Sequence, residues 1–141
     1  MFTKIDHVAV LVPNMDEAIQ LYTRCFEVEF ALRERNEEQG FEVATFKVGD
    51  ASFELLSPTR PDSVIAGMLK KHGPGIHHIG MEVEDIKDSM EAISEHGLKL
   101  TSEEPKRGSE DSLISFIHPK SLFGTMLELV EHPENDQLEE K

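Results

Sequence analysis

Two histidines and two glutamates occupy matching positions in two similar halves of the sequence. His7 aligns with His78 at an offset of 71 residues, and Glu54 aligns with Glu128 at an offset of 74 residues. Imidazole and carboxylate groups are ligands for divalent cations such as zinc, cobalt, nickel, manganese and iron. If the two halves face each other across a pseudo-two-fold axis, the four side chains meet at one point and form a metal site.

The alternation of side chains along a strand separates the two adjacent histidines. His78 lies in a strand-like stretch whose apolar residues occupy alternate positions and are expected to pack under a helix. His78 therefore points to the opposite face, whereas His77 points toward the helix and is expected to be structural. The same parity places His7, Glu54 and Glu128 on faces opposite the helices. A lone histidine or glutamate in a strand is usually structural or solvated, but four at equivalent positions favour a metal site.

The sequence around these residues predicts two copies of a strand–helix–strand–strand–strand module. The first copy covers residues 2–58 and the second covers residues 75–133, with a helical linker over 59–74 and a frayed tail over 134–141. The predicted fold class is α+β, with a single domain over residues 1–141. In this domain the two paired βαβββ modules form a curved mixed β-sheet cup with the helices outside.

Shorter segments complete this prediction. The strand that follows each module's helix is expected at residues 28–33 and 98–101. The linker helix is expected over 62–71, with a cap at its first or second residue. The loop 103–111 contains a proline and a glycine and is expected to be exposed and mobile.

The composition excludes several classes of partner. The chain has 141 residues, of which 28 are acidic and 14 are basic, so its formal net charge is -14. Nucleic acid and anionic membrane surfaces are therefore not expected as partners. Cys25 is the only cysteine, which excludes a disulfide and a cysteine-based zinc cluster, and it lies on an apolar helical stripe that places it in the core. No stretch has the character of a signal peptide or a membrane span, which predicts a cytoplasmic protein.

Several motifs resemble the vicinal oxygen chelate superfamily, which contains glyoxalases, bleomycin resistance proteins and dioxygenases. These motifs are the strand starts at residues 6–7 and 77–78 and the Glu-Leu strand ends at 54–55 and 128–129. Within the superfamily, the sequence is most similar to the methylmalonyl-CoA epimerases over residues 5–131. This second likeness is carried by Glu38-Gln39-Gly40, Glu54-Leu55-Leu56-Ser57-Pro58, Asp62-Ser63, Gly75-Ile76-His77-His78-Ile79, Glu104-Pro105-Lys106 and His118-Pro119-Lys120-Ser121.

The resemblance implies a glyoxalase-like fold and a metal-dependent epimerase that interconverts the C2 epimers of methylmalonyl-CoA through an enolate. It implies one divalent ion per chain, which is cobalt, zinc, nickel or manganese, held by His7, His78 and Glu128. Glu54 takes the fourth ligand position, where the family accepts either glutamine or glutamate. The resemblance also implies an acyl-CoA substrate and a homodimer. Glu128 is expected to act as a catalytic acid/base as well as a ligand.

A second acid/base group is needed, because inversion at C2 requires a proton from the opposite side of the carbon. Some bacterial epimerases carry a catalytic glutamate three residues after the glycine of the Glu-Gln-Gly motif, and Val43 stands there in this sequence. Glu42 is adjacent, but a step of one residue turns it to the other face of a strand. The sequence therefore leaves three alternatives: a bulge that presents Glu42, another group or a metal-bound water, or a different reaction.

An acidic protein must hold an anionic coenzyme through local cations. Lys120 and Ser121 in the His-Pro-Lys-Ser motif, and Lys106 with Arg107 in the loop 103–111, are the expected substrate-binding residues. Ordinary surface charge is an equally good interpretation of the loop pair.

Other functions on the same scaffold stay open at this point. A glyoxalase I-like lactoylglutathione lyase would share the metal ligands and bind a different thiol. An extradiol dioxygenase would use two histidines and one glutamate around iron, although such enzymes are usually longer. A metal-free module that binds small molecules or antibiotics would leave the four ligand-type residues without a purpose.

Overall fold

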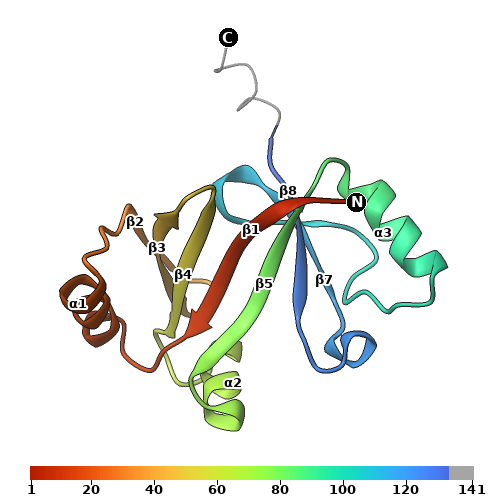
Figure 1. The fold of residues 1–141 in the computed structure, drawn as a ribbon. Coiled ribbons are helices and arrows are strands. Elements are labelled where there is room, and N and C mark those ends of the chain that lie inside the picture. The colour runs from red at the N-terminus through yellow and green to blue at the C-terminus, as the bar shows by residue number, and fades with distance from the viewer. Residues whose placement is uncertain (134–141) are drawn as a thin grey trace. The chain divides into compact units, whose positions relative to one another are not determined.

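The structure is a computed structural model, and it describes residues 1–133. The tail 134–141, predicted to be frayed, lies outside the described residues. Residues 1–133 contain eight strands and three α-helices (Figure 1). The chain divides into two compact units, a first unit of His7–His77 and a second unit of Met1–Asp6 with His78–Lys141.

Two long strands contribute to both units. They are β1 (Phe2–Leu11) and β5 (Gly75–Val83). The other elements of the first unit are α1 (Met15–Phe26), β2 (Leu32–Asn36), β3 (Phe41–Val48), β4 (Ala51–Pro58) and α2 (Val64–His72). The other elements of the second unit are α3 (Ile86–Glu95), β6 (Lys106–Arg107), the 3-10 helix η1 (Ser109–Asp111), β7 (Leu113–Ile117), the 3-10 helix η2 (Pro119–Leu122) and β8 (Leu127–Glu131).

The two units repeat one strand arrangement. In the first unit the strands are ordered β2-β3-β4-β1, and β1 runs parallel to β4 while the other neighbours are antiparallel. In the second unit the order is β5-β8-β7-β6, and β5 runs parallel to β8 while the other neighbours are antiparallel. The predicted α+β class with two βαβββ modules and mixed sheets is confirmed.

The helices begin where the sequence offers a capping side chain. The side chains of Asn14, Ser63 and Asp85 each accept a hydrogen bond from the backbone N–H three residues further on, at 3.0, 3.1 and 3.0 Å. Ser63 therefore caps the predicted linker helix. No helix within residues 1–133 has the length and apolar character needed to cross a membrane.

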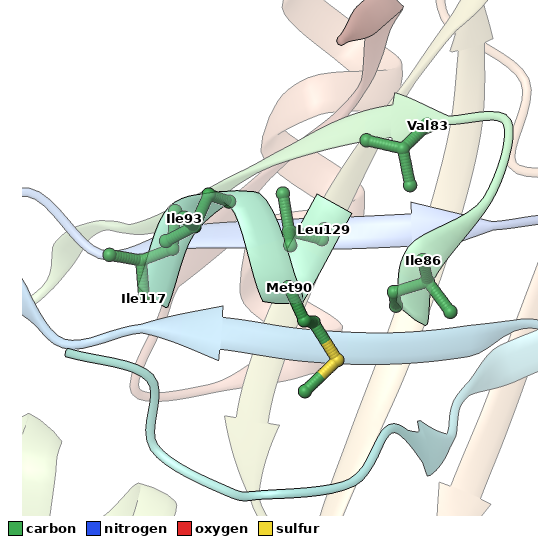
Figure 2. Packing of buried hydrophobic residues seen from close by; sticks show 6 residues of the cluster. All are labelled: Val83, Ile86, Met90, Ile93, Ile117 and Leu129. Carbon is green, nitrogen blue, oxygen red and sulfur yellow. The ribbon is translucent and has the colours of Figure 1, made fainter. Parts of the chain in front are cut away.

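Each unit buries one face of its strands under a helix. In the first unit Leu55 and Ala44 are fully buried and pack with residues of α1. In the second unit three residues of α3 pack on strands β5, β7 and β8 (Figure 2). The residues of this second cluster are Val83, Ile86, Met90, Ile93, Ile117 and Leu129. The parity predicted for the apolar residues of β4, β5 and β8 is confirmed.

Four local expectations need correction. The strand expected over residues 28–33 begins later, because β2 covers Leu32–Asn36. Cys25 was expected in the core, but it is exposed on α1. Residues 98–101 do not form a full strand, and only Leu100 makes an isolated bridge, to Ile117. The loop 103–111 is exposed for the most part, yet it contains β6 and η1, because Lys106 and Arg107 pair with β7.

Candidate functional site

The first unit holds one imidazole and one carboxylate on neighbouring parallel strands. His7 lies on β1 and is 5% exposed, and Glu54 lies on β4 and is partly buried. Ala9 is the register partner of Glu54, so His7 and Glu54 are diagonal neighbours on one face of the sheet. A ring nitrogen of His7 and a carboxylate oxygen of Glu54 lie within 4.8 Å of each other.

The alternation of β1 and β4 explains why these two residues share a face. Val10, Phe53 and Leu55 occupy the opposite positions and pack against the residues of α1. The face of His7 and Glu54 is not free of helices along its whole length, because α2 packs over Leu11 and Leu56 at its far end. The polar pair therefore lies on the face opposite α1, next to an apolar cluster under α2.

The second unit holds the equivalent pair. His78 on β5 and Glu128 on β8 are both buried, with side chains 8% and 7% exposed. The Nε2 atom of His78 lies 3.6 Å from Oε1 of Glu128. Gly80 is the register partner of Glu128, which repeats the diagonal relation of the first unit. The Phe116 ring meets the His78 ring edge-on at 5.4 Å and limits where the imidazole can move.

The donor types and their spacing fit a divalent metal ion. Ligands at about 2.0–2.2 Å from a zinc-like ion lie roughly 3.0–3.6 Å from one another. The distance of 3.6 Å between His78 and Glu128 is close to this range and too long for a strong hydrogen bond. The imidazole and carboxylate groups of His7, Glu54 and His78 are also donors of a kind that could hold a metal ion.

His77 has a different environment from His78. Its Nε2 atom lies 3.0 Å from the Sδ atom of Met68 on α2. Burial, together with the nearby His72, lowers the pKa of His77 below its ordinary value. This contact is a hydrogen bond between the imidazole and the thioether sulfur within the first unit, as expected for a structural histidine.

Glu42 lies on the face of β3 that packs under α1. Strands β3 and β4 pair without interruption from Phe41 opposite Pro58 to Val48 opposite Ala51, and Thr45 is the partner of Glu54. Glu42 therefore points away from the face of Glu54. The bulge that would present Glu42 as the second acid/base is absent from the described pairing of these strands.

The carboxylate of Glu42 is hydrogen-bonded to an arginine. Arg33 on β2 donates from Nε to Oε1 of Glu42 at 2.8 Å, and its second nitrogen lies 2.8 Å from Asp16 on α1. The hydrogen bond to Glu42, followed by the one to Asp16, raises the pKa of Arg33. Glu42 thus joins β2, β3 and α1 through Arg33, a structural role that the sequence analysis missed.

The expected substrate-binding residues differ in what they contact. Ser121 Oγ accepts a hydrogen bond from the Lys99 backbone N–H at 2.9 Å, which gives its hydroxyl a structural role. Lys120 is exposed in η2, and its backbone N–H donates to the His118 ring at 3.1 Å. Lys106 is exposed on β6, and Arg107 lies 3.6 Å from Asp111. All three cations are exposed on a fixed backbone, but Arg107 is paired with Asp111, so Lys120 and Lys106 are the better candidates.

The Glu-Gln-Gly motif forms a tight turn between β2 and β3. Gly40 has a positive φ of 75°, and a Cβ atom there would lie 2.8 Å from the Arg60 side chain. Arg60 donates to the backbone oxygens of Glu37 and Glu38 at 2.6 and 2.8 Å. In this chain the motif therefore serves to form the turn between β2 and β3 and to bind the Arg60 side chain.

Comparison with known proteins gives one family and a group of similar enzymes. Residues 6–116 match the sequence profile of the Glyoxalase/Bleomycin resistance protein/Dioxygenase superfamily. The ethylmalonyl-CoA/methylmalonyl-CoA epimerase of Cereibacter sphaeroides is 35% identical over 131 residues, which cover 92% of this chain and 98% of that protein.

Two solved structures share the fold. The methylmalonyl-CoA epimerase of Mycobacterium tuberculosis has a TM-score of 0.87 and 34% identity, over 97% of this chain and 93% of that one. A variant of the Streptomyces coelicolor methylmalonyl-CoA epimerase in complex with 2-nitronate-propionyl-CoA has a TM-score of 0.88 and 35% identity, over 94% of this chain and 96% of that one.

Proposed function

We propose that this chain interconverts the C2 epimers of methylmalonyl-CoA. The chain belongs to the Glyoxalase/Bleomycin resistance protein/Dioxygenase superfamily, and it is an enzyme of the epimerase type. The single observation that carries this proposal is the buried pair of His78 and Glu128, 3.6 Å apart. Two side chains of metal-ligand type at this spacing, in a chain about 35% identical to such an epimerase, support metal-assisted proton transfer at the carbon between the thioester and the carboxylate.

One divalent ion would be held by both donor pairs, His7 with Glu54 and His78 with Glu128. The support is the repeat itself, because each unit carries an imidazole and a carboxylate at equivalent strand positions. When bound, such an ion would supply a Lewis acid for the negative charge that develops on the substrate as the proton leaves. Cobalt, zinc, nickel and manganese all accept this mixture of nitrogen and oxygen ligands.

Glu128 is the residue that takes the proton from C2. Its carboxylate is buried, and one of its oxygens faces the His78 imidazole. The other oxygen is then the candidate for contact with substrate. A carboxylate is a weak base for a carbon acid, so the transfer depends on the thioester carbonyl, which acidifies the C2 proton, and on a positive charge that would offset the neighbouring substrate carboxylate.

Glu54 replaces Glu42 as the candidate for the second acid/base. Glu42 lies on the α1 face with its carboxylate bonded to Arg33, whereas Glu54 shares a face with His7. Glu54 is also the repeat counterpart of Glu128. Two equivalent carboxylates, one from each unit, would give the two proton-transfer groups that inversion at one carbon requires.

Lys120 is the proposed contact for the anionic part of the acyl-CoA substrate. The 3-10 helix η2 fixes its backbone, while its side chain is exposed. A local cation is needed because the chain as a whole carries a formal charge of -14. Lys106 is a weaker candidate on the exposed β6. The homodimer and the cytoplasmic location implied by the sequence stay predictions.

The test is an assay with racemic methylmalonyl-CoA in deuterated water, before and after treatment with a chelator. We expect deuterium at C2 and conversion of one epimer into the other, loss of both after chelation, and recovery on adding Co2+ or Zn2+. The hemithioacetal of methylglyoxal and glutathione serves as the control substrate. Turnover of that adduct alone would favour a lactoylglutathione lyase, and unchanged epimerisation after complete metal removal would contradict metal dependence.

A further inference from the structure

A second group of metal-ligand side chains lies in the second unit, separate from the four residues of the proposed active site. It consists of Asp6 near the middle of β1, Glu82 near the end of β5 and His132 directly after β8. One ligand atom from each residue lies within 4.8 Å of the others. Three segments that are far apart in the sequence therefore bring two carboxylates and one imidazole together.

The contacts within this group are close and partly shielded from solvent. The Nε2 atom of His132 lies 2.6 Å from Oδ1 of Asp6, and these two side chains are 28% and 16% exposed. The Thr3 hydroxyl donates to Oε1 of Glu82 at 2.9 Å and approaches the Glu82 backbone oxygen at 3.2 Å. The threonine thereby orients the Glu82 carboxylate, as hydrogen-bonded partners of metal ligands commonly do.

We propose that Asp6, Glu82 and His132 bind a second divalent ion, Zn2+, which links the middle of β1, the end of β5 and the segment after β8. One imidazole and two carboxylates suit zinc, which takes nitrogen and oxygen ligands at about 2.0–2.2 Å and completes its shell with water. The charge of the two carboxylates and the acidic character of the chain favour uptake of a cation.

The geometry requires only small side-chain movements. Ligands of a tetrahedral zinc ion lie roughly 3.3–3.6 Å apart. The contact of 2.6 Å between Asp6 and His132 would therefore widen by about an ångström, and the longest separation in the group, at most 4.8 Å, would close by a similar amount. Rotation about the side-chain torsions of Glu82 and His132 can supply both changes.

The site has a purpose independent of the proposed epimerase activity. None of its three residues belongs to the proposed catalytic or substrate-binding set. An ion there would hold together three strand segments of the second unit, and it would stabilise the folded chain because the unfolded chain lacks the preformed site. The inference stands whether or not the epimerase proposal holds.

Zinc stoichiometry provides the test. Chelator-treated full-length protein is titrated with Zn2+ by calorimetry, and bound zinc is counted after dialysis. We expect two equivalents in the natural chain, one in His132→Ala, one in His78→Ala and none in the double variant. His96→Ala, which removes an exposed imidazole at the end of α3, is the matched control and should keep two.

Two further measurements keep the proposal falsifiable. Glu82→Gln, which preserves size, should also lose one equivalent while circular dichroism shows an intact fold. The zinc-dependent rise in melting temperature should shrink in His132→Ala and Glu82→Gln, and epimerase turnover should stay within about twofold of the natural chain. Two equivalents of zinc in both variants would overturn the proposal, as would a natural chain that binds one equivalent and loses it in His78→Ala alone.

Discussion

Glu42 and Glu128 are two buried glutamates on strands of the same protein, with 8% and 5% of their surfaces exposed. The carboxylate of Glu42 accepts a hydrogen bond at 2.8 Å from Arg33, which also bonds to Asp16. The carboxylate of Glu128 lies 3.6 Å from the His78 imidazole, at the spacing of two ligands of one ion. Burial alone therefore does not distinguish the structural carboxylate of Glu42 from the carboxylate that we propose as catalytic.

The difference between the two residues follows from the face of the strand. Glu42 is on the α1 face of its unit, where an arginine offsets the cost of burying a charge. Glu128 is on the face opposite the α3 cluster, because its neighbour Leu129 packs there. The buried carboxylate of Glu128 lies 3.6 Å from the His78 imidazole, and these are two of the side chains that we propose as metal ligands.

Replacing Glu128 gives the largest expected effect. Glu128→Gln keeps the size and one ligand oxygen but removes the base, so exchange of the C2 proton should fall about 10²–10⁴-fold. The measurement is deuterium incorporation at C2, together with metal content and substrate binding. Glu42→Gln, assayed in parallel, should stay within about twofold of the natural chain. Near-normal exchange in Glu128→Gln with metal in place would make Glu128 a ligand alone.

The adjacent histidines extend the comparison to a matched pair. His78→Ala should lower metal content and epimerase activity together, by at least about tenfold, because it removes a proposed direct ligand. His77→Ala should keep both and lose only packing against Met68. Metal analysis of both purified variants checks this. Equal metal loss in the two variants would mean that metal binding depends on the integrity of the strand and not on the His78 side chain itself.

Much of the site could be predicted from the sequence, because its determinants are local. The parity of a strand fixes which of His77 and His78 shares a face with the apolar residues, and the repeat relates His7 to His78. Asn14 and Asp85 are capping residues that predict the starts of α1 and α3, the helices on the face opposite the candidate ligands. These features depend on neighbours within a few residues, where the alternation of side chains is reliable.

The rest depends on contacts between distant segments. Arg33 reaches Glu42 only because β2 and β3 pair in one register, and the sequence contains no sign of that partner. The Ser121 hydroxyl accepts a hydrogen bond from the backbone N–H of Lys99, 22 residues away. Cys25 shares the helical spacing of core residues, yet it is exposed on α1. Register and packing decide such cases, and neither is encoded locally.

Lys120→Ala should have a moderate effect that is confined to binding. Loss of one exposed cation should raise KM for the acyl-CoA about three- to tenfold at low ionic strength and leave kcat within about twofold, because charge-assisted contacts to phosphate add roughly 1 kcal/mol in solvent. Added salt should reduce the difference between the variant and the natural chain. Lys87→Ala, on α3, is the control for general surface charge. An unchanged KM at low salt would remove Lys120 from the substrate site.

Glu42→Gln gives the smallest expected effect on catalysis and a measurable effect on folding. The amide still accepts a hydrogen bond from Arg33 but loses the charge, so we expect the free energy of unfolding to fall by about 1–2 kcal/mol. Solvent screening keeps the loss at this level, because the Arg33 side chain is 44% exposed. Urea unfolding followed by circular dichroism measures the change, with Glu34→Gln on the exposed side of β2 as the control. If epimerisation collapsed while proton exchange from one epimer persisted, Glu42 would be the second acid/base after all, and the face on which a glutamate lies would not decide its role.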